Sequence, residues 1–356
     1  MKYGKAAARV FLLILLASLL TGCSGAKSDP EPMGKAYFTY FDTVSYVYSY
    51  AGDSADEFDA RSAGASAVLG KYHRLFDIYH EYSDMNNLCT VNRQAGGDPV
   101  PVEKELIDFM LCARDLYEKT DGEMNVMMGA VLSLWHEHRT AAEDDPKSAG
   151  IPDEEELIAA AEHIDFSLLE IDEENLTLRI TDPEASIDVG ALGKGYAAER
   201  AAEYLEADGA DGYVLNVGGN IRIIGTKPSG SGWVTAIKDP ADPDGSFIRR
   251  LLLADTACVT SGIYERYFMV GGVRYHHIID KDTLYPAAYF DSITIVTKDS
   301  ALADALSTAL FCMSYEDGLA LAQQLGGVDV LWVLPDGEVL YTPGLEEHFV
   351  ATSDNA

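Results

Sequence analysis

Segments with a period of two and segments with a helical period are interleaved along this chain without a strict strand–helix–strand alternation. The aromatic residues of 37–50 alternate with polar ones, which is typical of a strand with one buried face. Apolar residues recur at steps of three and four in 53–79 and 103–119, which predicts two amphipathic helices. A doubly wound sheet requires regular alternation, so the pattern favours an α+β fold.

The remaining segments extend the same mixture. We expect a polar loop at 86–93, and the acidic run 141–156 indicates a solvated loop followed by a helix start. Further helices are predicted at 126–138, 195–205, 301–313 and 316–325. Strands are predicted at 176–181, 185–189, 212–217, 221–225, 233–238, 248–253, 266–270, 273–279 and 290–297, with a final hairpin over 329–341.

The net charge excludes one class of partner. The 356 residues include 58 Asp and Glu against 26 Lys and Arg, which gives −32 at pH 7. A field of this sign repels phosphate backbones, and no basic patch in the sequence offsets it. Nucleic acid is therefore not expected as a partner.

The first 22 residues are typical of a secretory signal. Three basic residues precede the apolar run 10–20, which is too short for a spanning helix, and Leu20-Thr21-Gly22-Cys23 follows. This order resembles the bacterial lipoprotein cleavage signal, so we expect Cys23 to carry lipid on the outer side of the cytoplasmic membrane. Cleavage removes three basic residues and no acidic ones, so the net charge becomes −35. Lipid rather than surface charge would then hold the protein at an anionic membrane.

The mature chain is expected to have three parts. Residues 23–36 combine Gly, Pro and charge without periodicity, as a tether does, 37–349 form the folded domain, and 350–356 are a tail. No two of the four cysteines after Cys23 have CxxC spacing, so neither a zinc site nor a thioredoxin-like site is predicted. Free buried thiols and a disulfide both remain open.

The densest run of unusual residues is 187–197, IDVGALGKGYA. A strand here runs into three glycines and Lys194 at the start of a helix. Free N–H groups at a helix start favour an anion, and glycines let it approach, so the segment could cradle a phosphate. The spacing matches neither GxxxxGK nor GxGxxG, and a tight turn with a surface lysine is the alternative.

A second candidate site lies in the apolar helical segment 300–313. Asp304 and Thr308 are four residues apart, so their oxygens project from one face of the helix. Two hard oxygens at this spacing suit Mg²⁺, which binds a few protein oxygens together with water and phosphate. In the alternative, Asp304 is exposed on the polar side and Thr308 bonds back to a carbonyl.

Two adjacent histidines form the third candidate. His276 and His277 lie in a predicted strand and point to opposite faces, so at most one of them enters a given site. A zinc site that uses both is disfavoured, whereas one of them could be a general base. His136-Glu137-His138 has no partner cluster in the sequence.

With these segments assembled, the chain resembles the ApbE family of FAD:protein FMN transferases over nearly all of residues 37–349. The resemblance implies an ApbE-like α+β fold, related to the T-fold, with mixed sheets and packed helices. It also implies an enzyme that uses Mg²⁺ to transfer FMN from FAD to a threonine of an acceptor protein, with release of AMP. Five segments in family order carry the resemblance: DVGALGKGYA at 188–197, NVGGN at 216–220, TSG at 260–262, HIID at 277–280 and ADALST at 303–308.

The same resemblance assigns the chemical groups. It implies that the Ala191 carbonyl, Asp304 and Thr308 hold the metal ion, and that His277 is the base that takes the threonine proton. The residues implied in binding the flavin nucleotide are Phe41, Tyr79, Glu123, Met124, Asn125, Asp188, Lys194 and Ile278.

Three positions depart from the family pattern. Phe41 replaces a usual methionine, and Asn125 ends a triplet that usually ends in Asp. After Asp280, the family normally continues Pro-x-Thr-Gly, whereas this chain has KDTL at 281–284. Because both turn-forming residues are lost, we expect a reshaped loop and an altered substrate specificity.

Two other functions remain open from the sequence. A Mg²⁺-dependent FAD pyrophosphatase would use water in place of threonine and give FMN and AMP. A flavin-binding lipoprotein without catalytic activity would bind FAD and not turn it over. No acceptor sequence of the DxxTGAT type is present, so the expected targets are other proteins.

Overall fold

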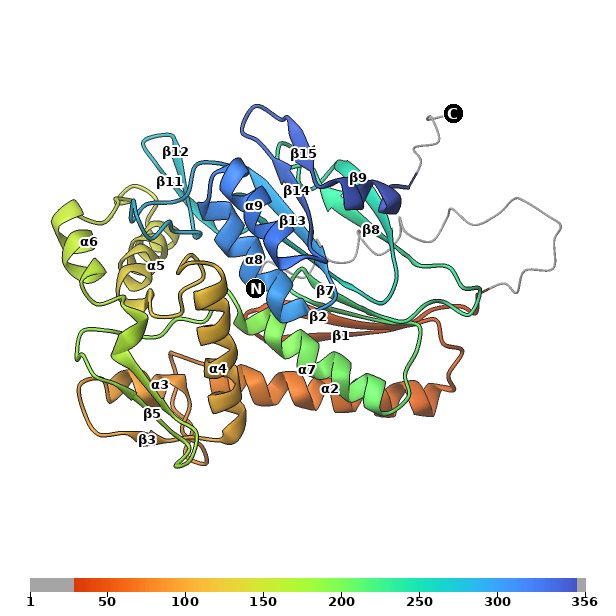
Figure 1. Cartoon of the computed structure of the whole chain (residues 1–356), viewed down its shortest axis with the longest axis horizontal. Coiled ribbons are helices and arrows are strands. Elements are labelled where there is room, and N and C mark those ends of the chain that lie inside the picture. Colours follow the sequence, from red (N-terminus) through yellow and green to blue (C-terminus); the bar gives the residue numbers. More distant parts are fainter. Residues whose placement is uncertain (1–28, 351–356) are drawn as a thin grey trace.

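An eight-stranded antiparallel sheet forms the centre of the fold (Figure 1). The computed structural model describes residues 29–350, so the expected signal sequence and Cys23 lie outside the described residues. In spatial order the strands are β1 (Met33–Tyr40), β2 (Thr43–Ser49), β6 (Tyr213–Val217), β7 (Asn220–Ile224), β10 (Ala257–Gly262), β13 (Ser292–Thr297), β14 (Asp329–Val333) and β15 (Val339–Tyr341).

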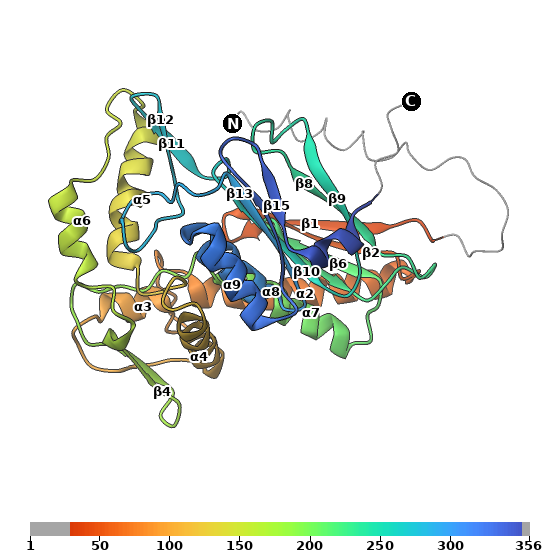
Figure 2. The same ribbon diagram turned by 45° about the horizontal axis from the view of Figure 1, so that its top comes forward.

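The two faces of this sheet bury different side chains. On β14, Val330 and Trp332 enter one core and Leu331 and Val333 enter another, as the period of two in a strand requires. Helices cover the first face, namely α2 (Ala55–Phe76), α7 (Gly193–Ala207), α8 (Ser300–Ala309) and α9 (Tyr315–Leu325) (Figure 1). The hairpin of β8 (Trp233–Lys238) and β9 (Phe247–Leu253) covers the other face (Figure 2).

Helix α2 shows how local sequence fixes a long element. Ser54 and Glu57 form a capping box, in which the Ser54 side chain accepts from the Glu57 N–H and the Ser54 N–H donates to the Glu57 carboxylate. Phe58, Leu69 and Tyr72 lie on the buried face. Helix α2 ends at Phe76, and the loop that contains Tyr79 begins there.

A second group of elements lies beside one end of the sheet (Figure 2). The hairpin β11–β12 packs on α5 through Trp135, whose ring stacks on Tyr275 at 5.8 Å and whose Nε1 donates to the Leu284 carbonyl at 2.9 Å. These elements are α3 (Leu88–Arg93), β3 (Val100–Pro101), α4 (Lys104–Lys119), α5 (Gly129–Asp144), α6 (Glu154–Ala161), β4 (Leu169–Asp172), β5 (Thr177–Ile180), β11 (Tyr267–Val270) and β12 (Val273–His276).

The N-terminal strand prediction is wrong in one respect. The segment 37–50 is part of a hairpin, in which Phe41 and Asp42 reverse the chain with φ of 55° and 51°. Neither residue is glycine, so the turn interrupts the aromatic alternation without a sequence signal. Residues 33–36 belong to β1, where Met33 pairs with Ser49, so the expected tether over 23–36 is too long.

Several other boundaries also differ. The expected loop 86–93 contains α3, because Asn87 and Thr90 form a capping box. Residues 185–189 form no strand beyond an isolated bridge between Met128 and Ser186. Helix α5 begins at residue 129 and ends at 144, α8 gives way to a 3-10 turn at 310–312, β12 ends at 276, and the short strand β4 was not predicted.

The described cysteines are free thiols. No disulfide joins Cys89, Cys112, Cys258 or Cys312 within residues 29–350. Burial raises the pKa of Cys112 to about 11 and that of Cys258 to about 12, which keeps both protonated at neutral pH.

Candidate active site

The glycine-rich junction before α7 is a tight turn. The Asp188 carboxylate accepts the Gly190 N–H at 2.8 Å, and the Lys194 ammonium donates to the Gly190 carbonyl at 3.2 Å. Ala191 lies half-buried between them. These bonds fold the segment on itself and place Lys194 on the first turn of α7, with its side chain 26% exposed.

Helix α8 meets the start of α7 at this junction. The Gly195 N–H donates to Asp304 Oδ2 at 2.8 Å, and the Lys194 Nζ lies 3.7 Å from Asp304 Oδ1. The anion at this helix N-terminus is therefore a carboxylate of the protein itself. The Asp304 side chain is only 5% exposed, so the alternative with Asp304 on the polar side of the helix is wrong.

The chemistry of these groups fits a divalent cation. Burial raises the pKa of Asp304, and Lys194 and the Gly195 N–H oppose that shift. The buried Asn220 Oδ1, near Asp304, has no hydrogen-bond donor among the described residues, and Thr308 follows one turn later on α8. Carboxylate, hydroxyl and carbonyl oxygens are the ligands that Mg²⁺ prefers. Residues 29–350 contain no group of three His, Cys, Asp or Glu side chains that could hold a metal ion.

Gly195 permits the close contact of the two helices. A Cβ at this position would lie 2.3 Å from the Ser300 carbonyl oxygen and 2.4 Å from the Asp304 Cβ. We expect Gly195→Ala to force the helices apart and to cost about 1–3 kcal/mol in the free energy of unfolding. Thermal melts measure this loss. Gly318→Ala is the control, since its Cβ would meet no atom closer than 3.6 Å, and an equal loss in both variants would contradict this role for Gly195.

The adjacent residues His276 and His277, at the end of β12, differ in their exposure to solvent. His276 is buried, and its Nε2 lies 2.9 Å from the Ala287 carbonyl oxygen while its ring contacts Phe311. His277 follows the end of β12 and remains accessible to solvent. His276 is therefore structural, and His277 is the histidine that can reach a substrate.

The surroundings of His277 keep its imidazole neutral. Neighbouring protein atoms desolvate part of the exposed ring, and this desolvation together with the charges of Arg266, Lys194 and Arg139 lowers the pKa of His277. A neutral imidazole can accept a proton, so His277 has the protonation state that a general base requires.

This pKa predicts an unusual pH dependence. An unperturbed histidine base would lose about tenfold in activity between pH 7.5 and 5.5, whereas His277, with its lowered pKa, should lose less over that range. Because its pKa is lowered below the unfolded value of 6.5, the folded state should lose stability as the pH falls below 6.5. Single-turnover transfer rates at fixed Mg²⁺ test the first expectation, and a tenfold fall in rate that follows one protonation would contradict it.

Two residues of α5, His136 and Arg139, lie close to the predicted flavin contact Tyr79 but were given no role from the sequence. Tyr79 follows α2 and is 54% exposed, and its ring lies 5.6 Å from the ring of His136 on α5. The guanidinium of Arg139 lies 2.7 Å from His136 Nδ1. Desolvation and the charge of Asp188 raise the pKa of Tyr79, while Arg139 and Arg266 lower it. The i, i+3 spacing of His136 and Arg139 was the available signal that both lie on one helix face.

The triplet 123–125 is only partly available to a ligand. Met124 is fully buried, and the Asn125 amide is occupied by the Ile164 carbonyl and the Met127 N–H. In this structure both side chains are therefore engaged by the protein itself, and their predicted role in flavin binding stays a prediction. Glu123 is paired with Lys281 at 3.1 Å, and its burial raises the pKa of its carboxyl group.

Two other predicted flavin contacts differ in accessibility. Phe41 lies at the tip of the β1–β2 turn, where its N–H donates to His73 Nδ1 at 3.3 Å, and its ring is half-buried. The side chain of Ile278 is buried in the core between the sheet and α8, and its carbonyl accepts the Ala287 N–H. Ile278 can thus meet a ligand only if this core opens.

The loop after Asp280 closes without proline or glycine. The Asp280 carboxylate accepts the N–H groups of Asp282 and Thr283, and the Leu284 N–H donates to the Asp280 carbonyl at 2.8 Å. Leu284 adopts φ of 64°, which a glycine would reach without strain. The chain therefore turns here without proline or glycine, and Lys281 contacts Glu123.

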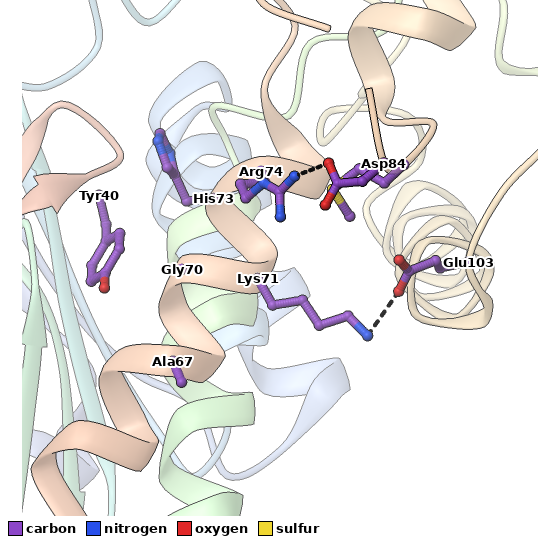
Figure 3. Close-up of a pocket in the computed structure, with 9 residues that line it drawn as sticks. Tyr40, Ala67, Gly70, Lys71, His73, Arg74, Asp84 and Glu103 are labelled. Carbon is purple, nitrogen blue, oxygen red and sulfur yellow. Dashed lines mark hydrogen bonds and ion pairs between the residues drawn. The ribbon is translucent and has the colours of Figure 1, made fainter. Parts of the chain in front are cut away.

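A pocket of about 510 Å³ lies next to the β1–β2 turn (Figure 3). Its cations are already paired, Arg74 with Asp84 and Lys71 with Glu103. None of the predicted site residues lines it. The predicted site residues lie outside this pocket, and Lys194 and Asp304 among them lie where α7 and α8 meet.

Sequence comparison identifies the class of protein that this fold and site define. The profile of the ApbE family matches residues 42–332, so the chain belongs to that family. It is 33% identical over 276 residues to an FAD:protein FMN transferase of Treponema pallidum, which covers 74% of each chain. It is 29% identical over 312 residues to one of Vibrio cholerae, which covers 87% of this chain and 90% of that one.

Solved structures confirm the α+β fold of the ApbE type. The ApbE protein of Thermotoga maritima superposes with a TM-score of 0.78 at 28% identity, over 90% of this chain and 100% of that one. The flavin transferase ApbE of Vibrio cholerae gives a TM-score of 0.73 at 25% identity, over 89% and 99%.

Proposed function

We propose that this protein transfers FMN from FAD to a threonine of an acceptor protein and releases AMP. The observation that carries the proposal is the meeting of Lys194 with the buried Asp304, together with an accessible His277 close enough for the Lys194 charge to lower its pKa. The relatives named FAD:protein FMN transferase support the choice of substrate.

The reaction is a phosphoryl transfer. The threonine oxygen forms a bond to the phosphorus of the FMN half of FAD, and the bond from that phosphorus to the bridging oxygen breaks. AMP leaves with the bridging oxygen. His277 takes the proton of the hydroxyl, which is a poor nucleophile without a base.

The site must bind a pyrophosphate despite a net charge of −32 on the chain. Lys194 supplies one local positive charge at the start of α7. We assign the Ala191 carbonyl, Asp304 and Thr308 as ligands of Mg²⁺, which when bound would neutralise charge on the pyrophosphate oxygens. Asp188 and Lys194 then face the nucleotide, and Phe41 and Tyr79 face the flavin ring.

We further propose that the enzyme works outside the cytoplasmic membrane, anchored by lipid on Cys23. The order of basic, apolar and small residues before Cys23 supports this location. Within residues 29–350, no helix combines the length and apolarity needed to cross a bilayer. Metabolic labelling with a fatty acid tests the anchor, and Cys23→Ala should remove both the label and the membrane association.

Intact mass of an acceptor protein tests the activity. Incubation of the acceptor with this protein, FAD and Mg²⁺ should raise the acceptor mass by one FMN, and replacement of its threonine should prevent the gain. Formation of FMN and AMP with an unchanged acceptor mass would instead show an FAD pyrophosphatase. Tight binding of FAD without turnover would show a flavin-binding lipoprotein.

A further inference from the structure

The pairing of β11 with β12 places an arginine opposite His277. Tyr267 pairs with His276, and one step outward the His277 N–H donates to the Arg266 carbonyl at 3.1 Å. Residues directly opposite each other in an antiparallel pair project their side chains to the same face. Arg266 and His277 therefore share one face of the hairpin, and His276 lies on the other.

Arg266 is the cation of this site with the most available donors. Its guanidinium forms no ion pair or hydrogen bond with any residue of 29–350, although the chain contains 58 acidic residues. Arg139 is bound to His136 and lies 3.7 Å from Glu143. Lys194 is bound to the Gly190 carbonyl. Arg266 is exposed to solvent beside the proposed base, so its donors are available to an anion from outside the chain.

We propose that Arg266 is a further catalytic residue that binds the phosphate of the FMN group during transfer. This inference rests on the proposed function, because His277 must reach the attacking hydroxyl and therefore stands next to the phosphorus. A guanidinium offers a planar fork of donors that matches two phosphate oxygens. Its charge would stabilise the negative charge on those oxygens in the transition state.

The same position links Arg266 to the state of the base. The charged or titratable groups around His277 are Arg266, Lys194, Arg139 and His276, and each of them disfavours a protonated imidazole. Arg266 thus helps to keep His277 neutral and supplies a positive charge at the phosphate.

A comparison of the affinities for FMN and riboflavin distinguishes a contact to the phosphate from the other flavin contacts. FMN and riboflavin differ only in the phosphate, and quenching of flavin fluorescence measures the affinity of the protein for each. We expect Arg266→Gln to weaken FMN binding by about tenfold or more and to leave riboflavin binding within about twofold. Arg266→Lys should lose less, because it keeps the charge and loses the fork.

Arg274 provides a matched control on the same hairpin. It pairs with Met269, and its guanidinium lies over the Tyr267 ring at 4.6 Å, on the face away from His277. Arg274→Gln should leave the affinities for both flavins unchanged. Equal losses for FMN and riboflavin in Arg266→Gln, or an unchanged FMN affinity, would overturn the proposal.

Transfer kinetics give a second readout. Arg266→Gln should lower kcat by roughly 100- to 1,000-fold, with a smaller change in KM for FAD. Because loss of its charge raises the pKa of His277, any acidic limb of the pH–rate profile should shift to higher pH. Equal kcat in wild type and variant would overturn the role in catalysis. Because the flavin affinities do not depend on turnover, failure of the wild type to modify an acceptor would reject the proposed function alone.

Discussion

Replacement of Asp304 by alanine is expected to abolish Mg²⁺-dependent FMN transfer. Asp304 is the only carboxylate among the proposed metal ligands, and it is buried against the start of α7 through the Gly195 N–H. A metal ion that stabilises charge on a phosphoryl group contributes several kcal/mol, which corresponds to on the order of a thousandfold in rate. Acceptor mass after single-turnover incubation with FAD measures the loss.

Thermal stability separates loss of the metal from loss of the fold. Asp304→Asn keeps an oxygen that can accept the Gly195 N–H but removes the charge, so its metal-free Tm should equal or exceed that of the wild type. Mg²⁺ should raise the Tm of the wild type and not that of the variant. Glu316→Ala, which removes an exposed acid on α9, is the control for a general charge effect. Transfer at the wild-type rate in Asp304→Asn would contradict the metal assignment.

Replacement of His277 by alanine is expected to slow transfer by roughly 100- to 10,000-fold and to leave the affinity for FAD nearly unchanged. The imidazole is neutral, accessible and placed beside Arg266, which suits proton removal from the incoming hydroxyl. The fall should appear in kcat with little change in KM, because a base acts on the transition state and not on bound FAD.

Two comparisons test whether this loss is chemical. Added imidazole should restore part of the transfer rate of His277→Ala, since it can replace the missing base. His348→Ala, on the short helix at residues 343–348 and outside the site, should transfer FMN at the wild-type rate. Full activity of His277→Ala, or an equal loss in both variants, would remove His277 from the base role.

The long helices were predictable because their apolar positions repeat over many turns. The segments 53–79 and 103–119 enclose α2 and α4. The β1–β2 turn was missed because Phe41 and Asp42 adopt left-handed conformations that the sequence does not announce. Helix α3 was missed because its capping residues resemble those of a polar loop.

The sequence likewise indicated some residues of the candidate site and not others. Lys194 and Asp304 were candidates from the residues themselves, whereas His277 was chosen over His276 only through the family resemblance. Arg266 was not found, because an arginine before a strand is ordinary until the register with β12 places it opposite His277. The family resemblance implied Met124 and Ile278 as flavin contacts, and the structure shows that their side chains lie in the core.

The amino-acid sequence alone determines the mixed α+β composition, the acidic charge and the segments that carry the reactive groups, because these depend on neighbours within a few turns or strand steps. The bond between Gly195 and Asp304 joins residues 109 positions apart, and it exists only because α7 and α8 meet at a glycine. The pairing of Arg266 with His277 likewise requires the β11–β12 register. Such contacts depend on packing between elements, so only the tertiary structure decides which of the candidate groups share a site.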